Sequence, residues 1–189
     1  MNIEDARAAQ ARSIARLIME AMNHECCQYF AGEGHTLHDF EGLMTRLVER
    51  DDSQYSYRNT LVATGEGQEV AGICVAYDGK DLRRLRKAFV KGALEAFGRD
   101  FSSMDDETGE GEFYIDSLAV SAAYRHRGIA TQLLKATIER ARTRGLSAVG
   151  LLVDQGNPRA EALYRRIGFA YENDASWGGH PMRHLQIKL

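Results

Sequence analysis

The most constraining stretch of the sequence is residues 147–153 (SAVGLLV), which are nearly all apolar. A strand has this composition when both faces of its sheet are covered. Strand-like and helix-like segments alternate around it, at residues 112–120, 128–144, 157–168, 169–172 and 182–189. We therefore expect an α/β fold in which helices cover both faces of a sheet.

The N-terminal part adds further elements with clear local signals. Apolar residues between Ile14 and Met22 follow the spacing of an amphipathic helix, and Thr36 with Asp39 resembles the capping box of a second helix. A GEGQ turn separates two strand-like segments, and residues 2–6 are consistent with a short first strand. The two segments beside the turn are residues 60–64 and 69–77.

The strongest charge contrast lies just before the strand at 112–120. A helix is expected over about 81–98, where basic residues are frequent, and residues 100–112 are rich in acidic residues without a basic one. The simpler interpretation is a solvated helix face that lies against an acidic loop. The alternative is that about 80–110 forms an insertion that shapes a substrate pocket within a single domain spanning 1–189.

Composition excludes several classes of function. The net charge of −3 gives no basis for binding nucleic acid or anionic membranes, and no apolar run approaches the ~20 residues of a membrane span. Three cysteines, two of them adjacent, make a poor disulfide framework. Because the first residues also lack an apolar signal region, we expect a reduced, cytoplasmic protein that is a monomer or a homodimer.

A turn at residues 124–130 (YRHRGIA) places glycine and arginines at the start of a helix. Helix N-termini have unpaired N–H groups and suit anions. The sequence lacks the GxxxxGK[ST] string of a P-loop, and RGIATQ lacks two glycines of a dinucleotide fingerprint. The remaining option is a pyrophosphate held by an R-x-x-G-x-A turn, which is formed here by Arg125, Gly128 and Ala130.

A second motif supports this interpretation, since residues 157–169 read NPRAEALYRRIGF. Together with the LAV at 118–120 and the turn at 125–130, this segment resembles the GNAT superfamily of acetyl-CoA-dependent N-acetyltransferases. The motifs occur in the order and spacing of that family and cover roughly residues 112–172. The resemblance implies a mixed, mostly antiparallel sheet that is flanked by helices on both faces and splayed between two central strands.

The resemblance also implies how acetyl-CoA binds and reacts. The main chain of Leu118, Ala119 and Val120 would hydrogen-bond the pantetheine arm, and Asn157 would cap its helix, contact the cofactor, or both. Tyr164 would be the general acid for the leaving thiolate, because a phenol stays protonated at neutral pH. The pyrophosphate would be held by the turn that begins at Arg125, through the N–H groups of His126, Arg127, Gly128, Ile129, Ala130 and Thr131.

An amine acceptor must lose a proton before it attacks a thioester. The resemblance implies that the general base is a carboxylate on or near the strand at 112–120. Glu112 and Asp116 share a face of this strand. We expect Leu118 and Val120 to continue the same alternation. Asp116 is the first candidate because it is nearer the splayed end, and Glu112 is the second.

Other polar residues are weaker candidates. Trp177 and His180 lie in a WGGHP loop that could approach the acceptor, although a plain turn is the simpler interpretation. The spacing of the N-terminal histidines does not suggest a metal site. Two alternatives to a small-amine acetyltransferase stay open: an enzyme that acetylates proteins or peptides, and a non-catalytic domain that binds or senses acyl-CoA.

Overall fold

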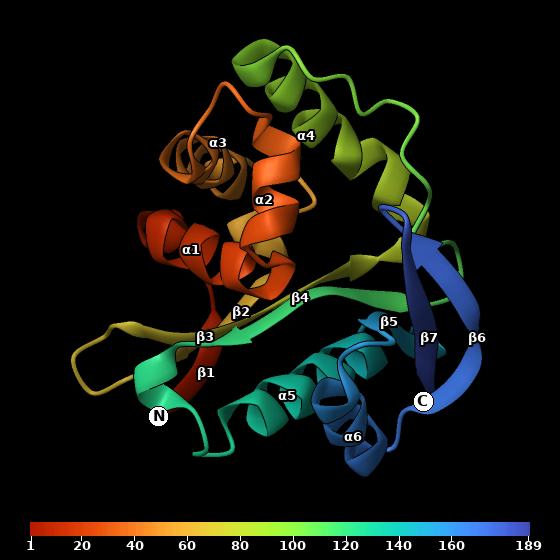
Figure 1. Cartoon of the computed structure of the whole chain (residues 1–189). Helices are drawn as coiled ribbons and strands as arrows, with labels where there is room; N and C mark the ends of the chain where they lie inside the picture. Colours follow the sequence, from red (N-terminus) through yellow and green to blue (C-terminus); the bar gives the residue numbers. More distant parts are fainter.

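The seven strands form one mixed sheet in the order β1-β2-β3-β4-β5-β7-β6, as described by a computed structural model of residues 1–189 (Figure 1). All neighbouring strands are antiparallel except β4 and β5. The strands are β1 (Asn2–Asp5), β2 (Thr60–Thr64), β3 (Val70–Asp78), β4 (Phe113–Val120), β5 (Ala148–Asp154), β6 (Ala170–Trp177) and β7 (His180–Lys188).

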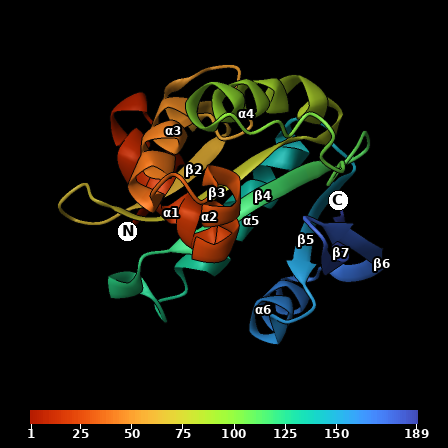
Figure 2. The ribbon, with the colours of Figure 1, turned by 45° about the horizontal axis from the view of Figure 1, so that its top comes forward.

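Helices cover both faces of this sheet, as expected. The helices lie in two layers, one above and one below the sheet in the view of Figure 1, and the turned view of Figure 2 shows the same two layers. The upper helices are α1 (Ala11–Met22), α2 (His24–Ala31), α3 (Leu37–Glu49) and α4 (Leu82–Phe97); the lower ones are α5 (Ile129–Thr143) and α6 (Pro158–Ile167). None of the helices has both the length and the apolar character needed to cross a bilayer.

Most of the elements expected from the sequence are confirmed, with one additional helix and one difference at a turn. The first helix ends at Met22, in agreement with its apolar spacing, and the additional helix α2 follows at once: Asn23 adopts a φ of 69° and its side chain accepts a hydrogen bond from the N–H of Cys26 in the first turn of α2. The expected WGGHP loop is only a two-residue turn at Gly178 and Gly179, since Trp177 and His180 pair with each other as the last rung of β6 and β7.

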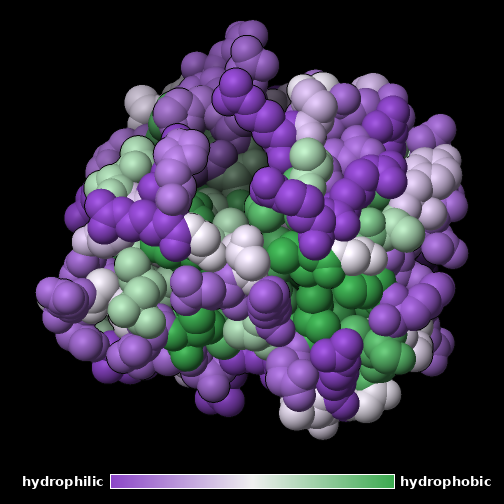
Figure 3. Space-filling model, turned by 90° about the horizontal axis from the view of Figure 1, so that it is seen from below, coloured by the Kyte–Doolittle hydropathy of each residue, from purple (hydrophilic) through white to green (hydrophobic).

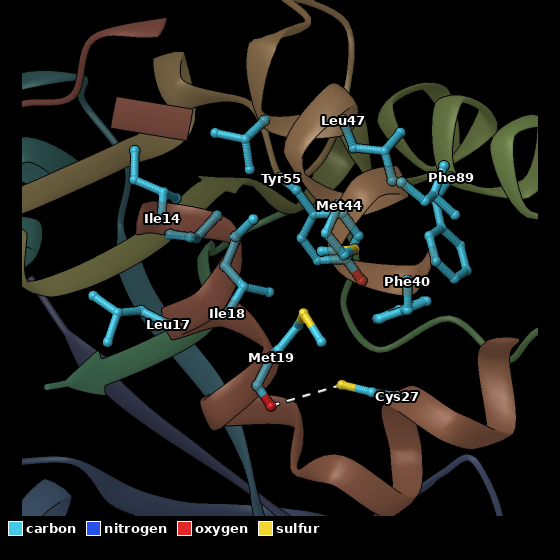
Figure 4. Packing of buried hydrophobic residues seen from close by; sticks show 14 of the residues in the cluster. Ile14, Leu17, Ile18, Met19, Cys27, Phe40, Met44, Leu47, Tyr55 and Phe89 are labelled. Carbon is cyan, nitrogen blue, oxygen red and sulfur yellow. Dashed lines mark hydrogen bonds between the residues drawn. The ribbon is translucent and has the colours of Figure 1, made fainter. Parts of the chain in front are cut away.

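The upper helices and the sheet enclose the larger apolar core (Figure 4). Ile14 and Ile18 on α1 and Phe40 on α3 are fully buried, and the Phe40 ring stacks on that of Phe30 with centroids 6.2 Å apart. Cys27 joins the same core and its thiol lies 3.7 Å from the carbonyl oxygen of Met19. The amphipathic spacing of α1 and α3 thus fixes both helices on one face of the sheet.

A β-bulge in β4 determines which side chains face each layer. Val75 of β3 pairs with Ser117 and Ala76 pairs with Ile115, so Asp116 is the extra residue. Tyr114 and Asp116 face the upper layer, whereas Leu118 and Val120 pack against the core below the sheet. The expectation that Leu118 and Val120 continue the alternation of Glu112 and Asp116 is therefore wrong, because the bulge shifts the alternation by one residue.

We expect Phe40→Ala to lower the free energy of unfolding by about 3–5 kcal/mol, because the substitution leaves a cavity in a core that cannot close it completely. Urea unfolding measures this loss. Leu94→Ala on α4 is the matched control, since Leu94 is 50% exposed, and its effect should stay within about 0.5 kcal/mol. Equal losses in the two variants would contradict the assignment of Phe40 to the core.

Candidate active site

Strands β4 and β5 separate soon after they pair. Their parallel register covers only Phe113 with Val149, Tyr114 with Gly150 and Ile115 with Leu151. Beyond Ile115, the edge of β4 that faces away from β3 has no partner strand over residues 116–120. Backbone polar groups along that edge are therefore available to an extended ligand. The expected splay between two central strands is confirmed.

Figure 3 views the molecule from below, the side on which α5 and α6 lie, and shows a hollow in this surface. Hydrophobic surface is visible beside the hollow, and hydrophilic side chains form much of its rim. A concave surface with apolar walls and a polar rim is typical of ligand sites.

The turn before α5 presents free backbone N–H groups. The first backbone bond of α5 runs from the N–H of Gln132 to the carbonyl of Gly128 at 3.1 Å, and no backbone carbonyl accepts from the N–H groups of 126–131. Gly128 has a φ of 74°, and a Cβ built on it would meet no atom within 4 Å. Together these features leave open space beside a row of donors at the positive end of a helix.

The arginine side chains of this turn are held by the protein itself. Arg125 donates to the carbonyl of Val120 at 3.1 Å and pairs with Glu20 at the same distance. The guanidinium of Arg127 lies over the ring of Tyr124, 5.3 Å from its centroid. The free anion-binding groups of the turn are therefore mainly those of the backbone.

Helix α6 places Tyr164 below the sheet. Its ring packs edge-on against Phe169 at 6.0 Å, and the side chain is half-buried against the lower core. Burial raises the pKa of Tyr164 above its ordinary value, so the phenol keeps its proton at neutral pH. Asn157 begins this helix, and its side chain accepts from the N–H of Ala160 at 3.2 Å, which confirms the expected cap.

Asp116 lies on the opposite face, at the point where β4 leaves β5. Its Oδ2 accepts from Gln54 Nε2 at 3.0 Å and from the Tyr77 hydroxyl at 3.2 Å, and its Oδ1 accepts from Ser117 at 2.9 Å. Burial raises the pKa of Asp116, and the three hydrogen bonds offset part of that rise. The bulge thus directs a half-buried carboxylate into a polar cluster beside the opening.

Glu107 joins this cluster from the loop between α4 and β4, although no motif in the sequence indicates a role for it. Its Oε1 accepts from the same two groups as Asp116, Gln54 Nε2 at 3.4 Å and the Tyr77 hydroxyl at 3.3 Å. Arg86 lies 3.3 Å from its Oε2. Burial, followed by the nearby Asp116 charge, raises the pKa of Glu107 to about 7, although Arg86 opposes this rise. The acidic run at 100–112 was the only sequence signal for this residue.

The carboxylate of Glu112, the second candidate base, is held by several hydrogen bonds within the protein. Its carboxylate accepts from Thr108 at 2.6 Å and from Gln186 at 2.9 Å, and it pairs with His184 at 2.8 Å. It lies over Gly150 of β5, where any Cβ would overlap its oxygens. Burial raises the pKa of Glu112, but the hydrogen bonds outweigh burial and the net pKa is lower than usual.

An open pocket of about 500 Å³ lies beside these groups, on the loop before β4 and on the C-terminal strands. Its wall includes five carboxylate residues, and its basic residues are His184 and Lys188. The carboxylates belong to Asp106, Glu107, Glu110, Glu112 and Glu172. Trp177 and His180 do not line the pocket, and Trp177 packs instead near Phe30, with ring centroids 6.0 Å apart.

The basic helix α4 is tied to the acidic loop that follows it. Arg83 and Arg86 both pair with Asp106, at 2.7 and 3.2 Å. The loop, rather than the helix, lines the pocket. No group of three or more His, Cys, Asp or Glu side chains is arranged to hold a metal ion.

Comparison with known proteins places this geometry in a family. The family model described as the acetyltransferase (GNAT) family matches residues 19–169. A crystal structure described as an acetyltransferase is 28% identical, with a TM-score of 0.79, and the match covers 100% of this chain and 99% of that one. An N-acetyltransferase from Staphylococcus aureus Mu50 has a TM-score of 0.84 at 24% identity, covering 99% and 100% of the two chains.

Curated relatives match a shorter segment. An L-methionine sulfoximine/L-methionine sulfone acetyltransferase of Pseudomonas aeruginosa is 42% identical over 28% of this chain and 31% of its own length. A [ribosomal protein bS18]-alanine N-acetyltransferase of Haemophilus ducreyi is 42% identical over 31% of this chain and 40% of its own. In all six curated matches the shared segment spans less than half of the relative.

The Glu112 network predicts a pH-dependent loss of stability on Gln186→Leu. This change removes one donor to a buried carboxylate, and we expect a loss of about 1–3 kcal/mol at neutral pH. Because the folded pKa of Glu112 is lowered, its contribution is complete above the unfolded pKa of about 4.3 and disappears as the pH falls through the folded pKa. The difference from the unmodified protein should therefore shrink in acid.

Urea unfolding at neutral and acidic pH measures this effect. Gln132→Leu, at an exposed position on α5, serves as the control and should change stability little at either pH. A loss on Gln186→Leu that stayed constant across the pH range would show that Glu112 does not gain from this hydrogen bond.

Proposed function

This chain belongs to the GNAT acetyltransferase family, and we propose that it moves an acetyl group from acetyl-CoA to a primary amine by direct attack in a ternary complex. The observation that carries the proposal is the separation of β4 from β5 after Ile115. Asp116 and Tyr164 belong to opposite layers around this opening. A thioester carbonyl in the opening would be accessible to a base from one side and an acid from the other.

The cofactor would be held mainly by backbone groups. The edge at Leu118–Val120 has no partner strand and suits the amides of a pantetheine arm, which would bind as an added strand; the carbonyl of Val120 already accepts from Arg125, so Leu118 would supply the free groups of this edge. The free N–H groups of 126–131 suit the pyrophosphate. A role for Asn157 in cofactor contact stays a proposal beside its observed cap.

Tyr164 would donate its proton to the sulfur as the C–S bond breaks. Its raised pKa keeps the donor protonated at working pH. The C–N bond forms as the C–S bond breaks, so the nitrogen of an incoming ammonium loses two protons in all. One replaces the proton lost from Tyr164, and the other is released to solvent.

Asp116 is favoured over Glu112 as the base. Burial raises the pKa of Asp116 toward neutrality, whereas the hydrogen bonds of Glu112 hold its pKa down. A base with a raised pKa takes a proton from an ammonium group more readily. Direct attack is also favoured over an acyl-cysteine intermediate, since burial raises the pKa of Cys74 to about 12 and that of Cys26 to about 11.

The acceptor would enter through the pocket beside Glu107 and Glu112. Carboxylates outnumber basic groups in its wall, which favours an amine that carries further positive charge. The relatives named above act on a small amino acid derivative and on a ribosomal protein, so both a small-molecule and a protein acceptor are retained. We retain a single domain over 1–189, with the segment at about 80–110 as an insertion that forms this wall.

Thiol release from acetyl-CoA in the presence of 1,4-diaminobutane, n-butylamine or a short peptide tests the function and the role of Tyr164. We expect release to depend on an amine, and Tyr164→Phe to lower kcat about 10²–10⁴-fold without changing acetyl-CoA affinity. Tyr171→Phe, at a tyrosine that is 47% exposed, should behave like the unmodified protein. If Tyr164→Phe lowers Tm but leaves kcat unchanged, Tyr164 contributes to packing and is not the general acid.

Gly128→Val tests the pyrophosphate turn. A Cβ at Gly128 would occupy the open space beside the free N–H groups, so calorimetry should show at least tenfold weaker binding of acetyl-CoA, which corresponds to about 1.4 kcal/mol. Gly145→Val is a matched control, because Gly145 has a φ of 73°, lies at the other end of α5 and also faces open space. The backbone strain should be similar in both variants, so equal affinities would refute this site.

A further inference from the structure

The loop between α4 and β4 brings a second carboxylate to Asp116. Glu107 Oε1 and Asp116 Oδ2 accept from the same two donors, Gln54 Nε2 and the Tyr77 hydroxyl, over distances of 3.0–3.4 Å. A shared pair of donors requires the two carboxylate oxygens to lie near one another. The Tyr77 hydroxyl has only one proton, so it can satisfy only one of these oxygens at a time.

Charge in this cluster is incompletely balanced. The guanidinium of Arg86 is the only cationic group in contact with the pair, and it also pairs with Asp106. With both carboxylates ionised, the cluster has an excess of negative charge in a poorly solvated position. Such a pair is relieved either by one shared proton or by a bound cation.

Glu107 also connects the cluster to the pocket. It is 9% exposed and lines the pocket wall, whereas Asp116 does not. An amine that enters through the pocket would therefore meet Glu107 on its way to the opening between β4 and β5. Glu107 thus combines three features: it lines the pocket, it carries part of the excess negative charge, and it shares its hydrogen-bond donors with Asp116.

We propose that Glu107 is a catalytic residue and that it forms with Asp116 a two-carboxylate base that binds the acceptor ammonium and accepts one proton from it. The N–H bond of the ammonium breaks, an O–H bond forms within the pair, and one negative charge remains on the pair. The free amine then attacks the thioester. This inference rests on the proposed acetyl transfer and adds to it a residue from outside the central strand.

Several charged or titratable groups surround Glu107 and would share in its pH response. They come from the helix, the strands and the loops packed against it, and they are Arg86, Asp106, Asp116, Tyr55, Tyr77 and Tyr114, with the indole of Trp177 on the β6 side. The three tyrosines stay neutral, because burial raises the pKa of each well above its ordinary value. Burial, followed by the charge of Asp116, raises the pKa of Glu107 to about 7, and burial also raises the pKa of Asp116; a raised pKa suits a base for an amine.

The test compares Glu107→Gln, Asp116→Asn and the double variant, with 1,4-diaminobutane as acceptor. Each single variant should lower kcat/KM for the amine about 10²–10⁴-fold at neutral pH, with unchanged acetyl-CoA affinity. The deficit should shrink as the pH approaches the pKa of the amine, where free amine no longer needs a base. Because the two carboxylates act as one base, the double variant should be little slower than the slower single variant.

Asp105→Asn is the matched control, since Asp105 is an exposed acidic residue of the same loop. It should retain normal rates. Infrared difference spectra of the unmodified protein give a readout that needs no variant. A protonated carboxyl band should disappear as the pH rises through about 7 and should be missing in Glu107→Gln if that variant folds.

The outcomes separate the two proposals. Normal turnover of Glu107→Gln, additive losses in the double variant, or the absence of the infrared band would overturn the two-carboxylate base and leave the acetyl-transfer proposal intact. A failure of the unmodified protein to release thiol with any amine would overturn the proposed function and, with it, the role of Glu107. Should Glu107→Gln fail to fold, Glu107→Asp replaces it: a catalytic role requires its rate to be reduced, and an undiminished rate overturns that role.

Discussion

Three rungs of parallel pairing between β4 and β5 are the constraint on which the site depends. β3 pairs with the outer edge of β4 from Phe113 to Val120, and β7 pairs with the outer edge of β5 along its whole length. Each central strand is thus fixed by its antiparallel neighbour while its inner edge is free beyond the third rung. The opening therefore follows from the pairing of the strands within the sheet.

The polar cluster beside this opening reduces the stability of the fold. Glu107 is ionised in an unfolded chain above a pH of about 4.3, but in the folded protein its pKa is raised to about 7. Between these values the folded state binds more protons, so this group makes folding less favourable as the pH rises through the interval. A buried carboxylate that destabilises the fold, as Glu107 does beside Asp116, is typical of a functional site, because residues needed for activity often lower stability.

Local patterns made much of this structure predictable. The capping box at Thr36, the turn around Gly128 and the Asn157 cap depend on residues that are close in sequence, and the structure has each of them. The acidic-loop interpretation of 100–112 also agrees with the ion pairs that Arg83 and Arg86 make with Asp106.

Features set by pairing between distant segments were not predictable. The bulge at Asp116 depends on how β3 is registered against β4, and that register is not encoded in β4 alone. Glu107 reaches the cluster because α4 folds back along the sheet, so its position in a charged loop gave no sign of its partners. The hydrogen bonds of Glu112 with His184 and Gln186 likewise join residues that are distant in sequence and meet only in the folded sheet.

The strand order at the C-terminal end has a consequence for synthesis of the protein. β7 lies between β5 and β6 in the sheet, although it follows both of them in the chain. Until residues 180–188 leave the ribosome, the largely apolar β5 has one edge without a partner strand. An exposed edge of this kind recruits other chains. During synthesis there is therefore an interval, which ends once residues 180–188 have emerged, in which this edge of β5 is open to pairing with other chains.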